Sequence, residues 1–175
     1  MQVLITGGYG CIGSWITKNL LERGHRVWIY DLKEDPRRLR LIMEEARVKQ
    51  VGFIQGDVTD LTGLRKTLKL FGISHVLHLA GLQVPTCRAD PILGAKVNVV
   101  GTLAVFEAVR QAEGQVQRLV YASSAAVFGP ATNRAMSSKV LLAIIQIHMM
   151  DGRELIQLGQ APSKVRGIGY LFHVR

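Results

Sequence analysis

The sequence predicts an α/β fold in which a doubly wound parallel sheet carries helices on both faces. Short apolar runs with β-branched residues alternate with stretches of helical periodicity up to about residue 122. These runs are apolar throughout, which is typical of strands buried on both faces of a parallel sheet. The first run leads directly into a glycine-rich turn, and a helix follows at once. Alternation and burial together indicate a single sheet between two layers of helices.

Five segments have the composition of strands: residues 3–5, 27–30, 51–55, 75–79 and 118–122. After the glycine-rich turn, a helix is predicted from the spacing of Ile12, Trp15, Ile16, Leu20 and Leu21, with Gly24 as its left-handed cap. The next helix is expected to have Pro36 in its first turn and to carry Leu39, Leu41, Ile42 and Ala46. A further helix follows the turn at 56–60.

A longer helix is predicted from Asp90 and Pro91, as N-cap and first-turn proline, to about Glu113. Gly94 and Gly101 interrupt it, and we expect them to permit close packing on a sheet. Beyond Gly129, residues 140–150 are predicted to form a buried helix and residues 165–174 a sixth strand.

Composition excludes several classes of protein. The chain has 175 residues, 48% of them apolar, and its apolar run at 140–150 is too short to span a bilayer. The two cysteines have no metal-ligand spacing, so no metal and no disulfide are expected. The N-terminus lacks the features of a signal peptide. These observations predict a cytoplasmic protein without membrane contact.

The net charge of +9 raises the question of nucleic-acid binding. The basic residues between 33 and 49 are interleaved with four acidic residues, as on a solvated helix face. No aromatic side chains stand among them to stack on bases. We therefore expect no nucleic-acid partner.

The stretch from Thr6 to Gly13 contains four glycines between a buried strand and a helix. Glycine lets the backbone turn sharply and approach a ligand, and the N–H groups and dipole of the helix favour an anion. Gly7, Gly10 and Gly13 in this position are typical of a Rossmann-type dinucleotide site. The alternative is a glycine turn that binds nothing.

Asp31 follows Gly13 by eighteen residues and ends the second predicted strand. A carboxylate there accepts hydrogen bonds from the adenosine ribose and repels a 2′-phosphate, so NAD is favoured over NADP. Because Lys33, Arg37 and Arg38 could attract a 2′-phosphate, NADP stays an alternative cofactor. The alternative role of Asp31 is that of a turn residue at the end of a strand.

Polar or small residues also follow the other predicted strands. Asp57 is placed either to reach adenine or to serve in a turn or helix cap. The segment from Leu79 to Gly81 allows close approach to a cofactor, whereas His78 is expected to be packed in the strand. Asn98 needs hydrogen-bond partners and either ties backbone together or orders the site.

Several motifs occur in a recognisable order: the glycine turn 6–13, Asp31, the turn 56–58, residues 78–81, residues 97–102 and residues 121–129. The chain thereby resembles the extended short-chain dehydrogenase/reductases, and among them the NAD-dependent epimerase/dehydratase family, which acts on nucleotide sugars. The resemblance covers residues 1–130 as an NAD(P)-binding domain. It leaves residues 131–175 as a divergent continuation and implies that a C-terminal substrate segment is missing.

The resemblance implies a site and a reaction. The cofactor-binding residues would be Gly7, Gly10, Cys11, Ile12, Gly13, Asp31, Leu32, Asp57, Val58, Leu79, Ala80, Gly81, Leu82, Gln83, Asn98 and Ser123. Ser124 would be the catalytic serine that hydrogen-bonds a sugar hydroxyl during hydride transfer to NAD. The family also implies a homodimer formed through two helices, one of them at 90–113.

One family feature is absent from the sequence. The tyrosines are at 9, 30, 121 and 170, and none has lysine four residues later. The family pair would fall near Met149 and Arg153. Three hypotheses follow: a nucleotide-sugar epimerase or dehydratase, an NAD-binding sensor or scaffold without catalysis, and an inactive product whose tail is frameshifted or truncated.

Overall fold

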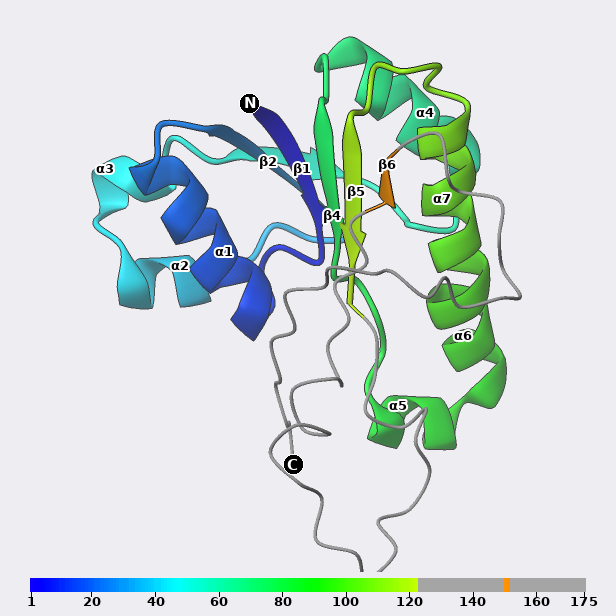
Figure 1. Ribbon diagram of the computed structural model, residues 1–175. Coiled ribbons are helices and arrows are strands. Elements are labelled where there is room, and N and C mark those ends of the chain that lie inside the picture. The colour runs from blue at the N-terminus through cyan, green and yellow to red at the C-terminus, as the bar shows by residue number, and fades with distance from the viewer. Residues whose placement is uncertain (123–149, 152–175) are drawn as a thin grey trace, which may run out of the picture.

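A computed structural model describes residues 1–122 and 150–151 and has a six-stranded sheet at its centre (Figure 1). The strands are β1 (Gln2–Thr6), β2 (Arg26–Asp31), β3 (Gly52–Gln55), β4 (His75–His78), β5 (Arg118–Tyr121) and β6 (Met150–Asp151), in the order β3-β2-β1-β4-β5-β6. The first five are parallel, with registers such as Leu4 opposite Trp28 and Val76. The predicted parallel sheet is therefore confirmed.

Helices cover both faces of the sheet. They are α1 (Cys11–Glu22), α2 (Arg37–Ile42), α3 (Glu45–Val48), α4 (Leu61–Leu70), α5 (Val84–Ala89), α6 (Pro91–Ala95), the π-helix η1 (Lys96–Gly101) and α7 (Thr102–Arg110). Figure 1 shows α1 to α3 on one side of the sheet, and α4, α6 and α7 on the other. The doubly wound arrangement predicted from the alternating segments is confirmed.

Alternate residues of each strand enter two separate cores, because successive side chains of a strand point to opposite faces. Leu4 and Tyr30 belong to the core that includes Val105 of α7, whereas Val3 and Ile5 pack with Leu21 of α1. A third cluster joins Ile29 to α2 and α3. The apolar strands are thus buried on both faces, as their composition predicted.

Two helix predictions between residues 36 and 113 need correction. The helix expected around 36–46 divides into α2 and α3, because Met43 has an extended backbone with φ −140° and ψ 153°. Leu41 is 83% exposed rather than buried, because residues two apart on a helix point to nearly opposite sides and Leu39 is the one that faces the core. The long helix ends at Arg110, not Glu113. The chain turns there, with Glu113 at φ 45°, and the Gln115 amide donates to Leu68 O of α4 and to Ile73 O.

The prediction for Gly24 is confirmed, whereas the packing of Gly94 and Gly101 on a sheet needs correction. Gly24 has φ 76° and its N–H bonds Leu21 O, so it closes α1 in the left-handed region. Gly94 and Gly101 allow close packing, but against neighbouring loops and a helix. A Cβ at Gly94 would lie 3.0 Å from Cys87, and one at Gly101 would lie 2.8 Å from Val58 Cγ2.

The sheet continues beyond β5 in the opposite direction. β6 pairs antiparallel with β5, and Met150 lies opposite Leu119. Met150 was expected to end the buried helix of residues 140–150, so this part of that prediction is wrong. The rest of that helix and the strand expected at 165–174 lie outside the described residues.

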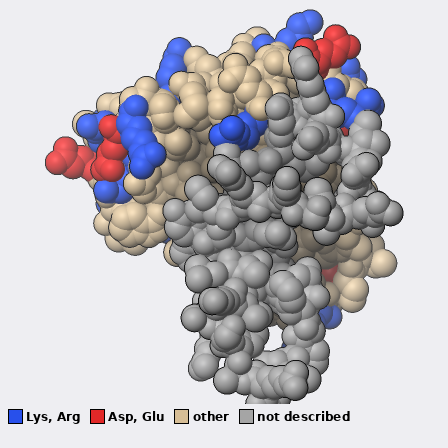
Figure 2. All heavy atoms as spheres, in the orientation of Figure 1, with Lys and Arg blue, Asp and Glu red and all other residues tan. Residues whose placement is uncertain are grey.

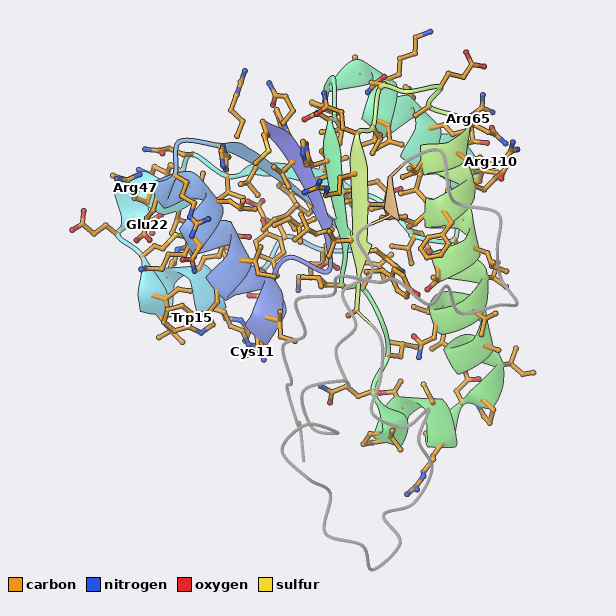
Figure 3. All side chains as sticks on the ribbon, viewed as in Figure 1. Cys11, Trp15, Glu22, Arg47, Arg65 and Arg110 are labelled. Carbon is orange, nitrogen blue, oxygen red and sulfur yellow. The ribbon has the colours of Figure 1, made fainter. Side chains whose placement is uncertain are left out.

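Charges on the surface are mixed in sign. Arg37 pairs with Asp35, Arg40 with Glu45 and Arg110 with Glu107. Figure 2 shows basic and acidic side chains side by side at the left and at the upper right of this face, with mostly neutral surface and a few basic side chains between them. Figure 3 places Arg47 at the α3 end of the molecule and Arg110 at the opposite end. The interleaving expected for residues 33–49 is confirmed.

The helix formed by α6, η1 and α7 is long and apolar. Residues 91–110 have a mean hydropathy of 1.6, enough by length and composition to cross a membrane, although a third of the stretch is buried against the protein. Such a stretch is weak evidence for a membrane span, because core helices of globular proteins have the same properties.

Candidate functional site

The predicted site residues lie at the carboxyl edge of the parallel strands. β1 has β2 on one side and β4 on the other, so the connections that leave β1 and β4 run in opposite directions from this point. Ligands of doubly wound sheets bind in the crevice at such a switch point. The glycine turn after β1 and the segment after β4 face each other there: a Cβ on Gly7 would lie only 2.8 Å from Ala80 N and Cα.

The glycine turn has the backbone that its sequence predicted. Gly7 has φ 67°, a left-handed conformation that L side chains rarely adopt. Gly13 lies against the turn itself, where a Cβ would be 2.6 Å from Gly8 Cα and O. Two glycines therefore allow contacts between backbones that any side chain would prevent.

The N-terminus of α1 is open to an anion. Gly10 is the N-cap and makes no side-chain cap bond, and the first turn has no acidic residue. Within residues 1–122, no side chain accepts from the first N–H groups of α1, and the helix dipole adds positive potential there. Figure 3 places Cys11 at this end of α1, with Trp15 one turn further along. Cys11 is exposed and Ile12 half-buried.

Asp31 ends β2, as predicted, and its carboxylate accepts the N–H of Leu32 at 2.9 Å. Partial burial raises the pKa of this carboxyl, against the lowering effect of that hydrogen bond. The nearby basic residues are partly engaged: Arg37 forms two short bonds with Asp35, and Arg38 reaches Tyr9 O at 3.5 Å. Asp31 itself has no ion pair among the described residues.

Asp57 is engaged in its own turn. Its Oδ1 accepts both the backbone N–H and the hydroxyl of Thr59 at 2.8 Å, and the backbone bond most strongly lowers the carboxyl pKa. The N-cap of α4 is Asp60, which accepts from Gly63 N. The structure thus gives Asp57 the turn role that was one of its two interpretations. Val58 is buried in the core.

Asn98 ties the segment after β4 to the long helix. Its Oδ1 accepts Leu82 N–H at 2.7 Å, and its Nδ2 donates to Leu82 O at 2.9 Å. The same amide contacts Cys87 Sγ at 3.5 Å. Asn98 lies in the π-helical turn η1, and such turns often occur at functional sites. Of the two roles considered for Asn98, the structure displays the backbone tie.

His78 is packed in the strand, as predicted, and is 4% exposed. Its ring joins two hydroxyls: Nδ1 lies 2.7 Å from Thr6 Oγ1, and Nε2 lies 3.0 Å from Thr102 Oγ1. Burial lowers the pKa of this imidazole to about 4. His78 is therefore neutral at physiological pH.

A cavity of about 620 Å³ opens beside this segment. It is lined by His78, Leu79, Ala80, Gly81, Leu82, Val84, Cys87, Arg88, Asn98, Thr102, Tyr121 and Ala122. Five of these were predicted cofactor residues. Gln83, which was also predicted, is exposed and is the N-cap of α5. Ser123 and Ser124 follow Ala122 and lie outside the described residues.

Sequence reasoning missed six lining residues: Val84, Cys87, Arg88, Thr102, Tyr121 and Ala122. Cys87 and Arg88 belong to α5, six residues that carry no regular apolar pattern. Thr102 offered a weak signal, since it stands four residues after Asn98 on the same helical face, and its hydroxyl donates to Asn98 O at 2.8 Å.

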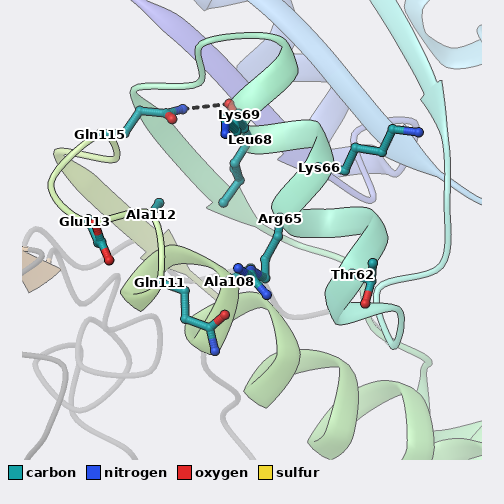
Figure 4. A pocket seen from close by; sticks show the side chains of 10 residues that line it. All are labelled: Thr62, Arg65, Lys66, Leu68, Lys69, Ala108, Gln111, Ala112, Glu113 and Gln115. Carbon is teal, nitrogen blue, oxygen red and sulfur yellow. Dashed lines mark hydrogen bonds between the residues drawn. The ribbon is translucent and has the colours of Figure 1, made fainter.

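A second hollow of about 520 Å³ lies between α4 and α7 (Figure 4). Its lining includes Arg65, Lys66 and Lys69 of α4. Figure 4 shows Lys66 directed away from Arg65, so the basic groups do not converge on one point. Gln115, also in the lining, is occupied with the Leu68 carbonyl at 2.6 Å. This hollow has no arrangement of groups suited to a defined ligand.

Comparison with known proteins decides the family. Residues 3–143 match the model of the NAD dependent epimerase/dehydratase family. The chain belongs to this family. The resemblance inferred from the motifs is thus confirmed, and so is the Rossmann-type fold.

The chain spans nearly the whole length of one relative but less than half the length of others. It is 39% identical over 131 residues to a UDP-glucose 4-epimerase of Klebsiella pneumoniae, covering 74% of this chain and 93% of that one. A Thermus thermophilus UDP-glucose 4-epimerase solved with NAD matches with 35% identity and TM-score 0.64, covering 77% of this chain and 42% of that one. The Bifidobacterium longum enzyme, solved with NAD+ and UDP, gives 29% identity and TM-score 0.62, covering 77% and 42%.

Proposed function

We propose that this chain binds NAD and serves in a nucleotide-sugar epimerase that acts on a UDP-sugar by hydride transfer. The observation that carries the proposal is the open N-terminus of α1 beside the backbone contact between Gly7 and Ala80, at the switch point of the sheet. The relatives solved with NAD and with UDP support the choice of ligands.

The residues fit the parts of a dinucleotide. The N–H groups around Cys11 and Ile12 would face the pyrophosphate, because helix N-termini bind phosphate. Asp31 and Leu32 would hold the adenosine ribose, and Asp57 and Val58 would flank adenine. The partly buried Asp31 carboxylate would oppose a 2′-phosphate, which favours NAD over NADP. With Arg37 already paired to Asp35, fewer cations remain to attract that phosphate.

The segment 79–83 would line the nicotinamide side, together with Asn98 and Ser123. When bound, NAD supplies the acceptor for a hydride from the sugar carbon. Ser124 would hydrogen-bond the reacting sugar hydroxyl. The cavity of about 620 Å³ next to this segment is of a size that suits a small-molecule ligand.

A second candidate function is NAD binding without catalysis. The observation that favours it is the absence from the printed sequence of any tyrosine followed by lysine at the fourth position. A tyrosine has an ordinary pKa of about 10 and needs a nearby cation to act as a base at neutral pH. Loss of such a base removes roughly 10²–10⁴ of the rate.

One experiment separates the two functions. Isothermal titration calorimetry with NAD should show saturable binding to the purified chain. The same chain is then incubated with NAD and UDP-glucose, and formation of the C4 epimer is followed by chromatography, because an epimerase returns the hydride and leaves NAD oxidised overall. Epimer formation supports the epimerase, whereas NAD binding without epimer formation across a panel of UDP-sugars supports the non-catalytic binder. A folded chain that shows no heat of binding with NAD contradicts both.

We also propose that the chain forms a homodimer through the face of α6, η1 and α7. Ile92 is 81% exposed, and Val99, Val100 and Leu103 are about half exposed on the same helix. Such contiguous apolar surface is typical of an interaction site. Sedimentation of the chain and of Val99→Glu should give a dimer and a monomer respectively. We further propose that the protein is cytoplasmic and has no nucleic-acid or membrane partners.

A further inference from the structure

We infer that His78, as the neutral tautomer protonated at Nε2, is a positioning residue that fixes segment 79–83 on the nicotinamide side of the site. The inference rests on the proposed NAD binding for its functional consequence only. The tautomer and the hydrogen-bond chain are properties of the ligand-free protein.

A series of hydrogen bonds links Ala80, Thr6, His78, Thr102 and Asn98, and the groups at its two ends determine the direction of each bond. At one end, Thr102 Oγ1 donates to the carbonyl of Asn98 at 2.8 Å, and a carbonyl can only accept. The single hydroxyl proton of Thr102 is therefore used. Thr102 Oγ1 can only accept from His78 Nε2, 3.0 Å away, so Nε2 carries the ring proton.

The other end gives the same answer. A neutral imidazole protonated at Nε2 has an acceptor at Nδ1. Thr6 Oγ1, 2.7 Å from Nδ1, must then donate its proton to the ring. That leaves the lone pairs of Thr6 Oγ1 free to accept the N–H of Ala80, which points at it from 3.3 Å. Each group in the chain uses its donor and its acceptor once.

This series of hydrogen bonds begins and ends at segment 79–83. It runs from Ala80 N–H through Thr6, His78 and Thr102 to the carbonyl of Asn98. The side chain of Asn98 in turn bonds both the N–H and the carbonyl of Leu82. Segment 79–83 is thus held at Ala80 from β1 and at Leu82 from η1, and the His78 ring joins these two supports.

Burial makes this arrangement costly to alter. Thr6 is fully buried and His78 is 4% exposed, so neither can exchange its partner for water. Removal of one partner leaves a buried donor or acceptor unsatisfied, which costs more than the bond contributes. Burial also lowers the pKa of the His78 ring, and no charged side chain among residues 1–122 contributes to that shift.

Substitutions of His78 can remove one or both of the hydrogen bonds that its ring makes. His78→Asn places an amide near the position of Nδ1, so its N or O can meet Thr6, while His78→Gln reaches toward Thr102. His78→Phe keeps a planar ring, although a larger one, and removes both bonds. His75→Gln is the matched control, because His75 lies on the same strand at its opposite end and its ring bonds Ser74 Oγ at 3.0 Å, outside this hydrogen-bond network.

The test has two readouts. Nitrogen-15 NMR of ring-labelled, ligand-free protein at pH 7 should show His78 with Nε2 protonated and Nδ1 bare. Titration with NAD should give a dissociation constant about tenfold weaker for His78→Phe, an intermediate loss for His78→Asn or His78→Gln, and a change below twofold for His75→Gln. Thr102→Val, which removes one hydroxyl only, should also weaken binding severalfold and serves if His78→Phe does not fold.

Two results would overturn the inference: a His78 ring protonated at Nδ1 or at both nitrogens, or folded His78→Phe and Thr102→Val proteins that bind NAD as tightly as the parent. If the parent itself does not bind NAD, the proposed function fails. The NMR result then still decides the tautomer, and hydrogen exchange of Leu82 N–H in Thr102→Val decides whether the chain holds the segment.

Discussion

The two sides of the candidate site are built by opposite means. The glycine turn on the pyrophosphate side is shaped by missing side chains: at Gly7 and Gly13 an added Cβ would lie only 2.6–2.8 Å from neighbouring backbone atoms. Segment 79–83 on the nicotinamide side is shaped by side chains, through Thr6, His78 and Asn98. Backbone-built sites tolerate no added atom, whereas side chain-built sites tolerate no lost hydrogen bond. Substitutions should therefore fail for different reasons on the two sides.

The largest expected effect is on the backbone-built side. Gly7→Ala should lower the free energy of unfolding by about 3 kcal/mol, because a left-handed φ is strained for alanine and the new Cβ meets Ala80 backbone. Gly24→Ala is the matched control: Gly24 has φ 76° but nothing within 4 Å, so about 1 kcal/mol is expected. Urea unfolding measures both. Equal losses would show that the close approach contributes nothing.

The next effect concerns pH and the side chain-built side. The pKa of His78 is about 4 in the folded protein, against an ordinary value of 6.5. Below pH 6.5 the unfolded chain therefore binds a proton that the folded chain does not, and stability falls as pH falls toward 4. Between pH 7 and 5 the loss should be about 2 kcal/mol.

His78→Asn isolates this contribution, because asparagine does not titrate. The pH dependence of its urea unfolding between pH 7 and 5 should be shallower than that of the parent by the same amount. Parallel curves for the two proteins would mean that His78 is protonated as easily when folded as when unfolded.

Asn98→Asp tests the other support of segment 79–83. Aspartate keeps an acceptor for Leu82 N–H but turns the donor toward Leu82 O into a second acceptor. We expect a loss of about 2 kcal/mol in unfolding free energy. Asn19→Asp is the control, since Asn19 donates to Trp15 O on an exposed helix face, and should cost under about 0.5 kcal/mol. A similar loss in both would remove the special role of Asn98.

The smallest effect compares the two cofactors. Asp31→Asn should weaken NAD binding about tenfold or less, roughly 1.4 kcal/mol, and narrow the preference for NAD over NADP, because the negative charge that opposes a 2′-phosphate is gone. Asp60→Asn, which alters the N-cap of α4, should leave both affinities within about twofold. Calorimetry with each dinucleotide gives the ratio, and an unchanged ratio would exclude Asp31 as the discriminating residue.

Sequence reasoning predicted the features that depend on neighbouring residues and missed those that depend on residues far apart in the chain. The glycine turn and Asp31 follow from consecutive residues and a strand end, and the structure places them as expected. The link between Thr6 and His78 joins residues 72 positions apart, so no local pattern shows it. The only signal was polar residues standing in otherwise apolar elements.

The misplaced elements have similar causes. Apolar periodicity alone placed Leu41 in a buried helix, but tertiary packing turns Leu39 to the core and leaves Leu41, two residues further on, pointing away from it. After α7 ends, Gln115 bonds Leu68 O of α4 and Ile73 O, long-range contacts that no helix propensity anticipates. The role of Ser124 and the domain division at residue 130 stay predictions.

The π-helical turn η1 has a consequence for chain length. A π-turn is an α-helix with one residue inserted, so deletion of one residue between Asn98 and Gly101 would restore regular helix. Gly101 against Val58 and the buried face of α7 would hold the downstream part in place. The upstream part would then rotate by about 100° and carry Asn98 away from Leu82. The spacing between Asn98 and Thr102 is therefore as much a part of the site as the residues themselves.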